Sequence, residues 1–197
     1  MTNHDLTPVP AQPASAAGRQ PGDGVPRIVV MGVSGSGKST IGALVADAMN
    51  APFLDGDSLH PLSNITKMAA GTPLTDEDRW PWLAIVGDEL AAAGPAGMVI
   101  ACSALKRSYR DAIRAKAPDA IFLHLDGSLE VLGSRLEGRS GHFMPPALLA
   151  SQLATLEAIE ADESAVVIDI AAGVTSILAD SVAGIRAVLA ARPTPGQ

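Results

Sequence analysis

Residues Gly32 to Ser39 read Gly-Val-Ser-Gly-Ser-Gly-Lys-Ser, and this octapeptide constrains the fold more than any other feature of the chain. It matches the pattern of a phosphate-binding loop (P-loop), which joins a buried strand to a helix. A short apolar run, Ile28 to Val33, leads into it, and an amphipathic stretch, Ser39 to Asn50, follows it. This context favours a P-loop at the end of a strand over the alternative, an ordinary glycine-rich turn.

Each group of the loop has a use in binding nucleotide phosphates. Glycines let successive backbone N–H groups curl around a phosphate, and the following helix adds the partial positive charge of its N-terminus. We expect Lys38 to act in catalysis by neutralising the β and γ oxygens of ATP, and the Ser39 hydroxyl to ligate Mg²⁺. The residues of this segment predicted to bind ATP are Gly32, Ser34, Gly35, Ser36, Gly37, Lys38, Ser39 and Thr40.

Short apolar runs alternate with longer amphipathic stretches along the rest of the chain. The predicted strands are Ile28 to Val33, Pro52 to Leu54, Met98 to Cys102, Ile121 to Leu125 and Ala165 to Ile170. The predicted helices are 39–50, 64–70, 76–93, 106–117, 128–138, 146–160 and 175–191. Continuous apolar runs are typical of parallel strands buried on both faces. The alternation predicts an α/β fold, a three-layer α/β/α sandwich of the P-loop NTPase type with a five-stranded parallel sheet.

The length of 197 residues leaves room for one domain with a single sizeable core. Residues 1–26 are rich in Pro, Ala and Gly and have no apolar period, so we expect a disordered N-terminal tail. We assign residues 27–192 to a single P-loop domain and residues 193–197 to a C-terminal tail.

Composition excludes several classes of partner. The chain carries 14 basic and 21 acidic residues, a net charge of -7, so we expect no nucleic-acid partner and no membrane partner. Its single cysteine, Cys102, cannot form an internal disulfide, and we read it as a small buried residue. No segment has the pattern of a signal peptide or of a membrane span, and we expect a cytoplasmic protein.

A P-loop alone leaves kinases, GTPases and ATP-driven machines open. The guanine-reading Asn-Lys-x-Asp signature of switch GTPases is absent from the sequence. The chain is also too short for the additional modules of a motor. A small phosphotransferase is therefore favoured, while a regulatory module that binds nucleotide without chemistry remains the alternative from another class.

Two carboxylates, Asp55 and Asp57, follow the second predicted strand at the edge where the γ-phosphate should lie. In an extended segment, residues two apart project to the same face. Asp55 would hold a water of the Mg²⁺ shell, and Asp57 would orient and deprotonate an acceptor hydroxyl. The alternative is that both side chains cap the following turn.

Three segments together resemble the gluconate kinase (gluconokinase) family of shikimate-kinase-like small P-loop kinases. They are Asp55 to Leu83, which includes Asp-Gly-Asp-Ser-Leu-His and Asp-Arg-Trp-Pro-Trp; Cys102-Ser-Ala-Leu-Lys106 with Tyr109-Arg110-Asp111; and Arg139-Ser-Gly-His142-Phe-Met-Pro with Ser151-Gln152. The resemblance implies ATP-dependent phosphorylation of D-gluconate at its C6 hydroxyl to 6-phospho-D-gluconate, commonly by a homodimer. Kinases of shikimate or of a nucleoside monophosphate remain the nearest alternatives.

An open-chain polyol with a terminal carboxylate needs cations for the acid and hydrogen-bonding groups for its hydroxyls. On this reading the substrate-binding residues are Asp57, His60, Asn64, Lys67, Arg79, Lys106, Arg110, His142 and Gln152. Arg79 is the first choice for the carboxylate, because its planar fork binds bidentately. Lys67 and Arg110 have a solvated surface charge as their alternative. Trp80 and Trp82 are read as packing that fixes the loop.

Arg135 and Arg139 are four residues apart near the end of a predicted helix, so their like charges lie on one face. Such a pair favours an anionic target. In small P-loop kinases this segment is a mobile lid that closes over ATP, and its arginines stabilise the transferring phosphoryl group. We place the lid at about residues 135–147, with Arg139 in catalysis; a surface helix end is the alternative.

Overall fold

The computed structural model describes residues 26–137 and 146–192. The predicted N-terminal tail up to residue 25, the tail at 193–197 and the lid residues 138–145 lie outside the described residues. Arg139 and His142 belong to the last of these ranges, so their predicted roles stay predictions.

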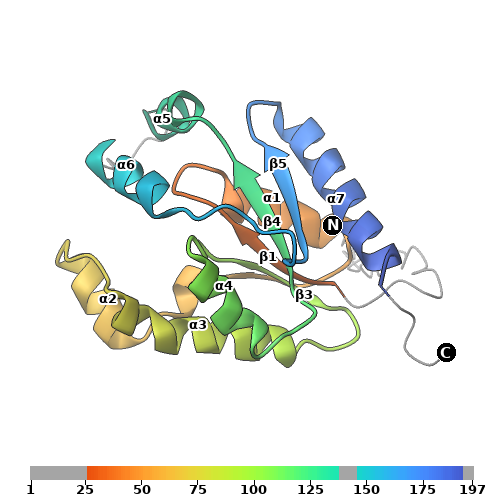
Figure 1. Cartoon of the computed structure of the whole chain (residues 1–197), viewed down its shortest axis with the longest axis horizontal. Coiled ribbons are helices and arrows are strands. Elements are labelled where there is room, and N and C mark those ends of the chain that lie inside the picture. Colours follow the sequence, from red (N-terminus) through yellow and green to blue (C-terminus); the bar gives the residue numbers. More distant parts are fainter. Residues whose placement is uncertain (1–25, 138–145, 193–197) are drawn as a thin grey trace, which may run out of the picture.

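The described chain forms one five-stranded parallel sheet with the strand order β2-β3-β1-β4-β5 (Figure 1). The strands are β1 (Arg27–Met31), β2 (Phe53–Asp55), β3 (Met98–Ala101), β4 (Ile121–Asp126) and β5 (Ala165–Asp169). Because the chain reverses its lateral direction between β3 and β4, the carboxyl ends of the neighbouring strands β1 and β4 flank a topological switch point. The predicted α/β fold with a five-stranded parallel sheet is confirmed.

Helices cover both faces of the sheet and its carboxyl edge (Figure 1). They are α1 (Lys38–Ala48), the 3₁₀ helix η1 (Gly56–Leu59), α2 (Leu62–Ala69), α3 (Asp76–Ala91), α4 (Arg107–Arg114), α5 (Leu129–Glu137), α6 (Pro146–Thr155) and α7 (Val174–Ala190). Helices α1 and α7 pack on one face, and α3 and α4 pack on the other. Helices α2, α5 and α6 lie beyond the carboxyl ends of the strands.

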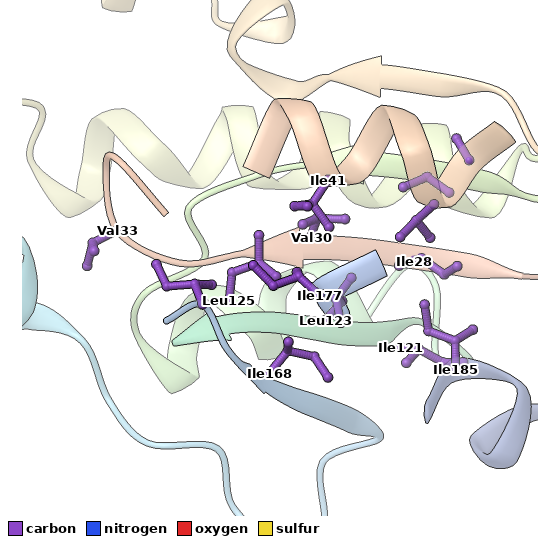
Figure 2. Close-up of a cluster of buried hydrophobic side chains, with 14 of the residues drawn as sticks. Ile28, Val30, Val33, Ile41, Ile121, Leu123, Leu125, Ile168, Ile177 and Ile185 are labelled. Carbon is purple, nitrogen blue, oxygen red and sulfur yellow. The ribbon is translucent and has the colours of Figure 1, made fainter. Parts of the chain in front are cut away.

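Each face of the sheet has its own apolar core. On one face Val30, Leu123 and Ile168 pack against Ile41 of α1 and Ile177 of α7 (Figure 2). The second core packs the other side chains of β1, β3 and β4 against α3 and α4; among them are Val29, Ile100, Phe122, Leu83 and Ile113. Alternation along a strand sends neighbouring residues to opposite cores, so the central strands are buried on both faces as predicted.

Two predictions about the elements are wrong. The edge strands β2 and β5 are only partly buried, and Val167 is 53% exposed, because an edge strand has a neighbour on one side only. The helix expected at 146–160 ends at Thr155. Residues beyond it turn back along the body of the protein, and Glu157 N donates to Leu105 O at 2.9 Å. No helix in the described ranges is long and apolar enough to cross a membrane.

Candidate active site

The P-loop connects the buried end of β1 to the first turn of α1. Gly32 has a φ of 140°, and a Cβ there would lie 2.7 Å from the carbonyl oxygen of Leu125 on β4. Gly37, the residue that precedes α1, has a φ of 95°. Both positions therefore require glycine, and the loop is packed tightly between the ends of β1 and β4.

Lys38 folds back over the loop that it belongs to. Its Nζ donates to the carbonyl oxygen of Val33 at 3.1 Å, and the side chain is half-buried rather than exposed. Ser36 Oγ is fully buried and has no hydrogen-bond partner among the residues that the structure describes. Ser34, Gly35 and Gly37 remain partly accessible, and Ser39 and Thr40 are exposed at the start of α1.

The two residues predicted to hold Mg²⁺ are in direct contact. Ser39 Oγ donates to Asp55 Oδ2 at 2.8 Å. Asp55 also caps η1, since its other carboxylate oxygen accepts from Asp57 N at 3.1 Å. Asp55 therefore lies beside the P-loop and also caps the following turn, as its alternative had it, while its role in the Mg²⁺ shell stays a prediction.

Asp57 lies in η1 and not in an extended segment, so the expected projection of both carboxylates from a strand is wrong. Helix η1 is held against α3, because the indole Nε1 of Trp82 on α3 donates to Gly56 O at 2.7 Å. Trp82 is buried, which confirms its role as packing. Asp57 itself is exposed.

Cys102 directly follows β3, the strand next to β2, and is buried. Burial raises the pKa of its thiol to about 12, with Asp57 and Asp55 adding to the rise and Lys38 opposing it. The thiol is therefore neutral at physiological pH, as expected for a packing residue. These three charges act on one site, which places them around the end of β3.

His60 and Asn64 form a buried group between η1, α2 and α3. The His60 ring stacks on Trp82 with 4.1 Å between ring centroids. Burial lowers the pKa of His60, and Arg79 acts in the same direction while Asp57 opposes it. Asn64 Nδ2 lies 3.2 Å from His60 Nδ1 and donates to Asp78 O at 2.8 Å. Asn64 thus joins α2 to α3.

Lys67 and Lys106, two of the predicted substrate-binding cations, are paired with carboxylates of α3. Lys67 Nζ contacts both oxygens of Asp78, at 2.6 and 2.8 Å. Asp78 is also the acidic member of a capping box with Thr75, which starts α3. Lys106 Nζ lies 2.7 Å from Asp76 Oδ2. Hydrogen bonds from these lysines lower the pKa of Asp78 and of Asp76.

Arg79 differs from the two lysines. Its Nη1 donates to the carbonyl oxygen of Leu74, and Asp76 Oδ1 lies 4.0 Å away, beyond hydrogen-bond distance. The guanidinium lies 5.8 Å from the centre of the Tyr109 ring, and Tyr109 OH donates to Asp76. Within the described part of this cluster, Arg79 is the cation that makes no hydrogen bond to a carboxylate.

Arg135 and Gln152 both reach the P-loop. Arg135 Nη1 donates to Ser36 O at 3.3 Å, and its Nη2 donates to Ile170 O. Gln152, on α6, accepts a hydrogen bond of 2.7 Å from Ser34 N through its side-chain oxygen. The structure therefore places Gln152 at the phosphate loop and not among the acceptor residues with which it was grouped.

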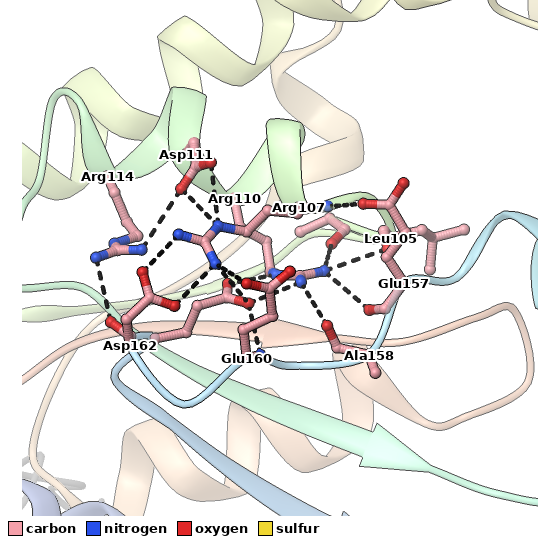
Figure 3. A network of polar contacts seen from close by, with 11 residues as sticks. Leu105, Arg107, Arg110, Asp111, Arg114, Glu157, Ala158, Glu160 and Asp162 are labelled. Atoms are coloured by element: carbon pink, nitrogen blue, oxygen red, sulfur yellow. Dashed lines mark hydrogen bonds and ion pairs between the residues drawn. The ribbon is translucent and has the colours of Figure 1, made fainter.

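Arg110, another predicted substrate residue, lies outside the site in the structure. Its side chain is fully buried in the second core, and its guanidinium is bonded to Glu163 and to backbone carbonyl oxygens (Figure 3). A small acid cannot reach a group so enclosed. Neither substrate binding nor the alternative of a solvated surface charge describes Arg110.

Comparisons with known proteins show which family this chain resembles. A family model described as shikimate kinase matches residues 34–175. The thermosensitive gluconokinase of Escherichia coli (strain K12) is 50% identical over 146 residues, which cover 72% of this chain and 78% of that protein. The gluconokinase of Gluconobacter oxydans is 50% identical over 141 residues, 71% of this chain and 79% of that protein.

The chain belongs to the gluconokinase family of shikimate-kinase-like P-loop kinases. A crystal structure of a gluconokinase from Sinorhizobium meliloti superposes with a TM-score of 0.76 at 50% identity, covering 81% of this chain and 91% of that one. The predicted family is confirmed.

Sequence reasoning on this gluconokinase-family chain did not assign roles to Asp76, Asp78, Tyr109 and Glu163. The first two stand at the start of α3, where acidic residues favour the helix N-terminus, so a local role was sufficient to explain them. One signal was present all the same, because Lys67 lies in the same stretch, 11 residues from Asp78. Glu163 gives no such signal, since it is 53 residues from Arg110.

Proposed function

We propose that this chain transfers the γ-phosphoryl group of ATP to the C6 hydroxyl of D-gluconate, giving 6-phospho-D-gluconate and ADP. The observation that carries the proposal is the hydrogen bond between Ser39, at the end of a complete P-loop, and Asp55. Next to it is the acceptor cluster, which holds the cations Lys67, Arg79 and Lys106. Membership of the gluconokinase family supports the same acceptor.

The residues of the loop fit an ATP–Mg²⁺ complex. The buried and unpartnered Ser36 Oγ and the positive end of α1 suit phosphate oxygens. Ser39 and Asp55 offer oxygen ligands, and Mg²⁺ is commonly held by few protein oxygens together with waters and substrate phosphates. Bound there, Mg²⁺ supplies charge neutralisation at the β- and γ-phosphates. Lys38 and Arg135 add positive charge beside the same loop.

Asp57 is the proposed base. It is exposed on η1, it follows Asp55 by two residues, and its charge acts both on Cys102, which follows β3, and on His60, which stacks on Trp82. A carboxylate between the phosphate loop and the acceptor cluster can orient the C6 hydroxyl and accept its proton.

Arg79 is the proposed partner of the gluconate carboxylate. Lys67 and Lys106 each already have a carboxylate within hydrogen-bond distance, whereas Arg79 has none among the described residues. An ammonium has three N–H donors, so each lysine can still donate to a substrate hydroxyl while it stays paired. His60 and His142 complete the proposed hydrogen-bonding groups.

We propose three further properties of the enzyme. Arg139 would stabilise the transferring phosphoryl group from the lid, the enzyme would work in the cytoplasm, and it would assemble as a homodimer. The dimer is tested by measuring the molar mass of the protein by light scattering during size-exclusion chromatography. The mass of a monomer would contradict the proposal.

The function is tested by coupled ADP release with gluconate, glucose, shikimate and AMP as acceptors. We expect gluconate to be preferred by orders of magnitude in kcat/KM, since glucose has no carboxylate to accept hydrogen bonds from Arg79. Arg79→Gln should raise the KM for gluconate about 10- to 100-fold and leave the KM for ATP unchanged, which is the range for loss of a charged hydrogen bond. The control is Arg186→Gln, at an exposed position of α7. Comparable rates with glucose would refute the proposal.

A further inference from the structure

Arg110 is a charged side chain held at 0% exposure inside the protein. It stands on α4 and projects toward the core that contains Tyr109 and Ile113. Burying a charge is costly unless it is paired and each polar hydrogen finds an acceptor. The hydrogen-bond partners of Arg110 therefore show which segments of the chain this buried charge holds together.

These partners come from two separate segments of the chain (Figure 3). Glu163 takes the guanidinium bidentately, with Nε to Oε1 at 2.6 Å and Nη2 to Oε2 at 2.8 Å. Nη1 donates to Leu105 O and to Glu157 O, both at 3.2 Å, and Nη2 donates to Ala158 O at 3.0 Å. Arg110 thus ties the loop between β3 and α4 to the segment that follows α6.

The first of these segments, residues 102–106, supports the beginning of the P-loop. Ser103 O accepts a hydrogen bond of 3.3 Å from Gly32 N. The next residue, Ala104, has a φ of 44°, a strained value for a residue with a side chain, so the surroundings must hold it in place. Arg110 Nη1 lies 3.5 Å from Ala104 O and bonds the carbonyl of the residue after it.

The second segment, which follows α6, supports the P-loop at Ser34, two residues after Gly32. Glu157 and Ala158 begin two residues after the end of α6, and Glu157 N donates to Leu105 O at 2.9 Å. About one turn before the end of that helix, Gln152 accepts the N–H of Ser34 at 2.7 Å. The position of the end of α6 therefore decides whether Gln152 can reach the loop.

We propose that Arg110 is a positioning residue for phosphoryl transfer, which fixes the P-loop through two contacts, Ser103 with Gly32 and Gln152 with Ser34. This inference rests on the proposed kinase activity. Reacting groups must be held to within a fraction of an ångström, and a displacement of about 1 Å far from the chemistry can cost about 100-fold in rate. Arg110 contacts no substrate and acts only by holding in place the two segments that support the P-loop.

The test replaces Arg110 by lysine, which keeps the charge but loses the planar fork that bonds several acceptors at once. The matched control is Arg27→Lys, because Arg27 also joins distant segments, donating to Leu90 O at 2.8 Å and to Asp119 at 2.6 Å, but at the amino end of the sheet. Both variants should lose stability. Only Arg110→Lys should lower kcat/KM for ATP, by about tenfold or more, with the change in gluconate KM smaller.

A double-mutant cycle separates positioning from general loss of stability. Gln152→Leu alone should raise the KM for ATP, and in the Arg110→Lys background it should add little, because its contact is already displaced. If Arg110→Lys does not fold, Glu163→Gln takes its place in the cycle. Additive effects, or a folded Arg110→Lys enzyme that resembles Arg27→Lys, would overturn the inference. Failure of the wild-type enzyme to phosphorylate gluconate would instead refute the proposed function.

Discussion

Ser39 Oγ and Asp55 Oδ2 lie 2.8 Å apart, so the residue that follows the P-loop lysine is bonded to the carboxylate that ends β2. The two strands that deliver these residues are not neighbours, since β3 lies between β2 and β1. The bond therefore spans the carboxyl edge of the sheet. It joins the phosphate side of the site to the acceptor side.

Replacing Asp55 by asparagine should lower activity about 10- to 100-fold, the usual cost of losing a group that orients a metal shell. The neutral amide can still accept from Ser39, so the fold should persist. We expect the loss to be partly recovered at high Mg²⁺ concentration, measured as the Mg²⁺ dependence of kcat/KM. Asp47→Asn, at an exposed position of α1, is the control. An unchanged Mg²⁺ dependence would contradict the role given to Asp55.

Lys38→Met should lower kcat by at least about 100-fold, because a preorganised charge at the transferring phosphoryl group is lost. Loss of the hydrogen bond from Lys38 to Val33 O is worth about 1 kcal/mol, so the melting temperature should change little. Turnover and thermal melting of the same preparation check both statements. Lys116→Met, a surface change that removes an ion pair with Asp88, is the control. Near-normal kcat in folded Lys38→Met would remove the P-loop from the mechanism.

Asp57→Asn should reduce kcat by about 100-fold or more while the gluconate KM changes less, as expected for loss of a positioned base. Because Asp57 is exposed and its backbone N–H, not its side chain, bonds Asp55, the turn should be preserved. Steady-state kinetics with gluconate varied at saturating ATP measure both constants. A change in KM alone would show that Asp57 only binds substrate.

Stability should fall as the pH is lowered below about 6.5, because two histidines are buried and burial favours their neutral form. Burial lowers the pKa of His124 on β4, with Arg110 acting in the same direction and Asp126 opposing it, and its Nε2 has no partner in the described part of the chain. The unfolded chain binds the proton first, so the free energy of unfolding falls from about pH 6.5 down to the lower pKa of the folded state.

Substitution of His124 by leucine removes one of these titrations. The drop in melting temperature between about pH 7.5 and about pH 5 should then be smaller than in the wild-type protein. His60, whose pKa burial also lowers, keeps part of the effect. Equal slopes for the two proteins would show that His124 does not contribute.

Local patterns predicted the fold, the P-loop and the position of Asp55 beside it. The P-loop is a contiguous motif, and the position of Asp55 follows from the rule that parallel strands end at one edge. The edge strand β5 was predicted to be buried because an apolar run does not say which strands have two neighbours. Asp57 was misjudged for a local reason, since Gly56 and Asp57 turn into η1 directly after β2.

The predicted role of Arg110 failed because its partners are distant in the sequence. Helix spacing did carry a warning: Arg110 and Ile113 are three residues apart on α4, so they share one face, and that face is buried. The acceptor Glu163 could not have been chosen from the sequence. The same holds for Gln152, whose contact with Ser34 depends on where α6 ends.

The central claim concerns which acceptor receives the phosphate and at which atom. The direct measurement is ATP-dependent phosphate incorporation into D-gluconate, followed by NMR of the purified product to locate the phosphate ester. The account predicts one product, with phosphate on the terminal C6 oxygen, because Asp57 and Arg79 must hold opposite ends of one carbon chain. Phosphate at any other oxygen, or no incorporation into gluconate while shikimate or AMP is phosphorylated, would contradict it.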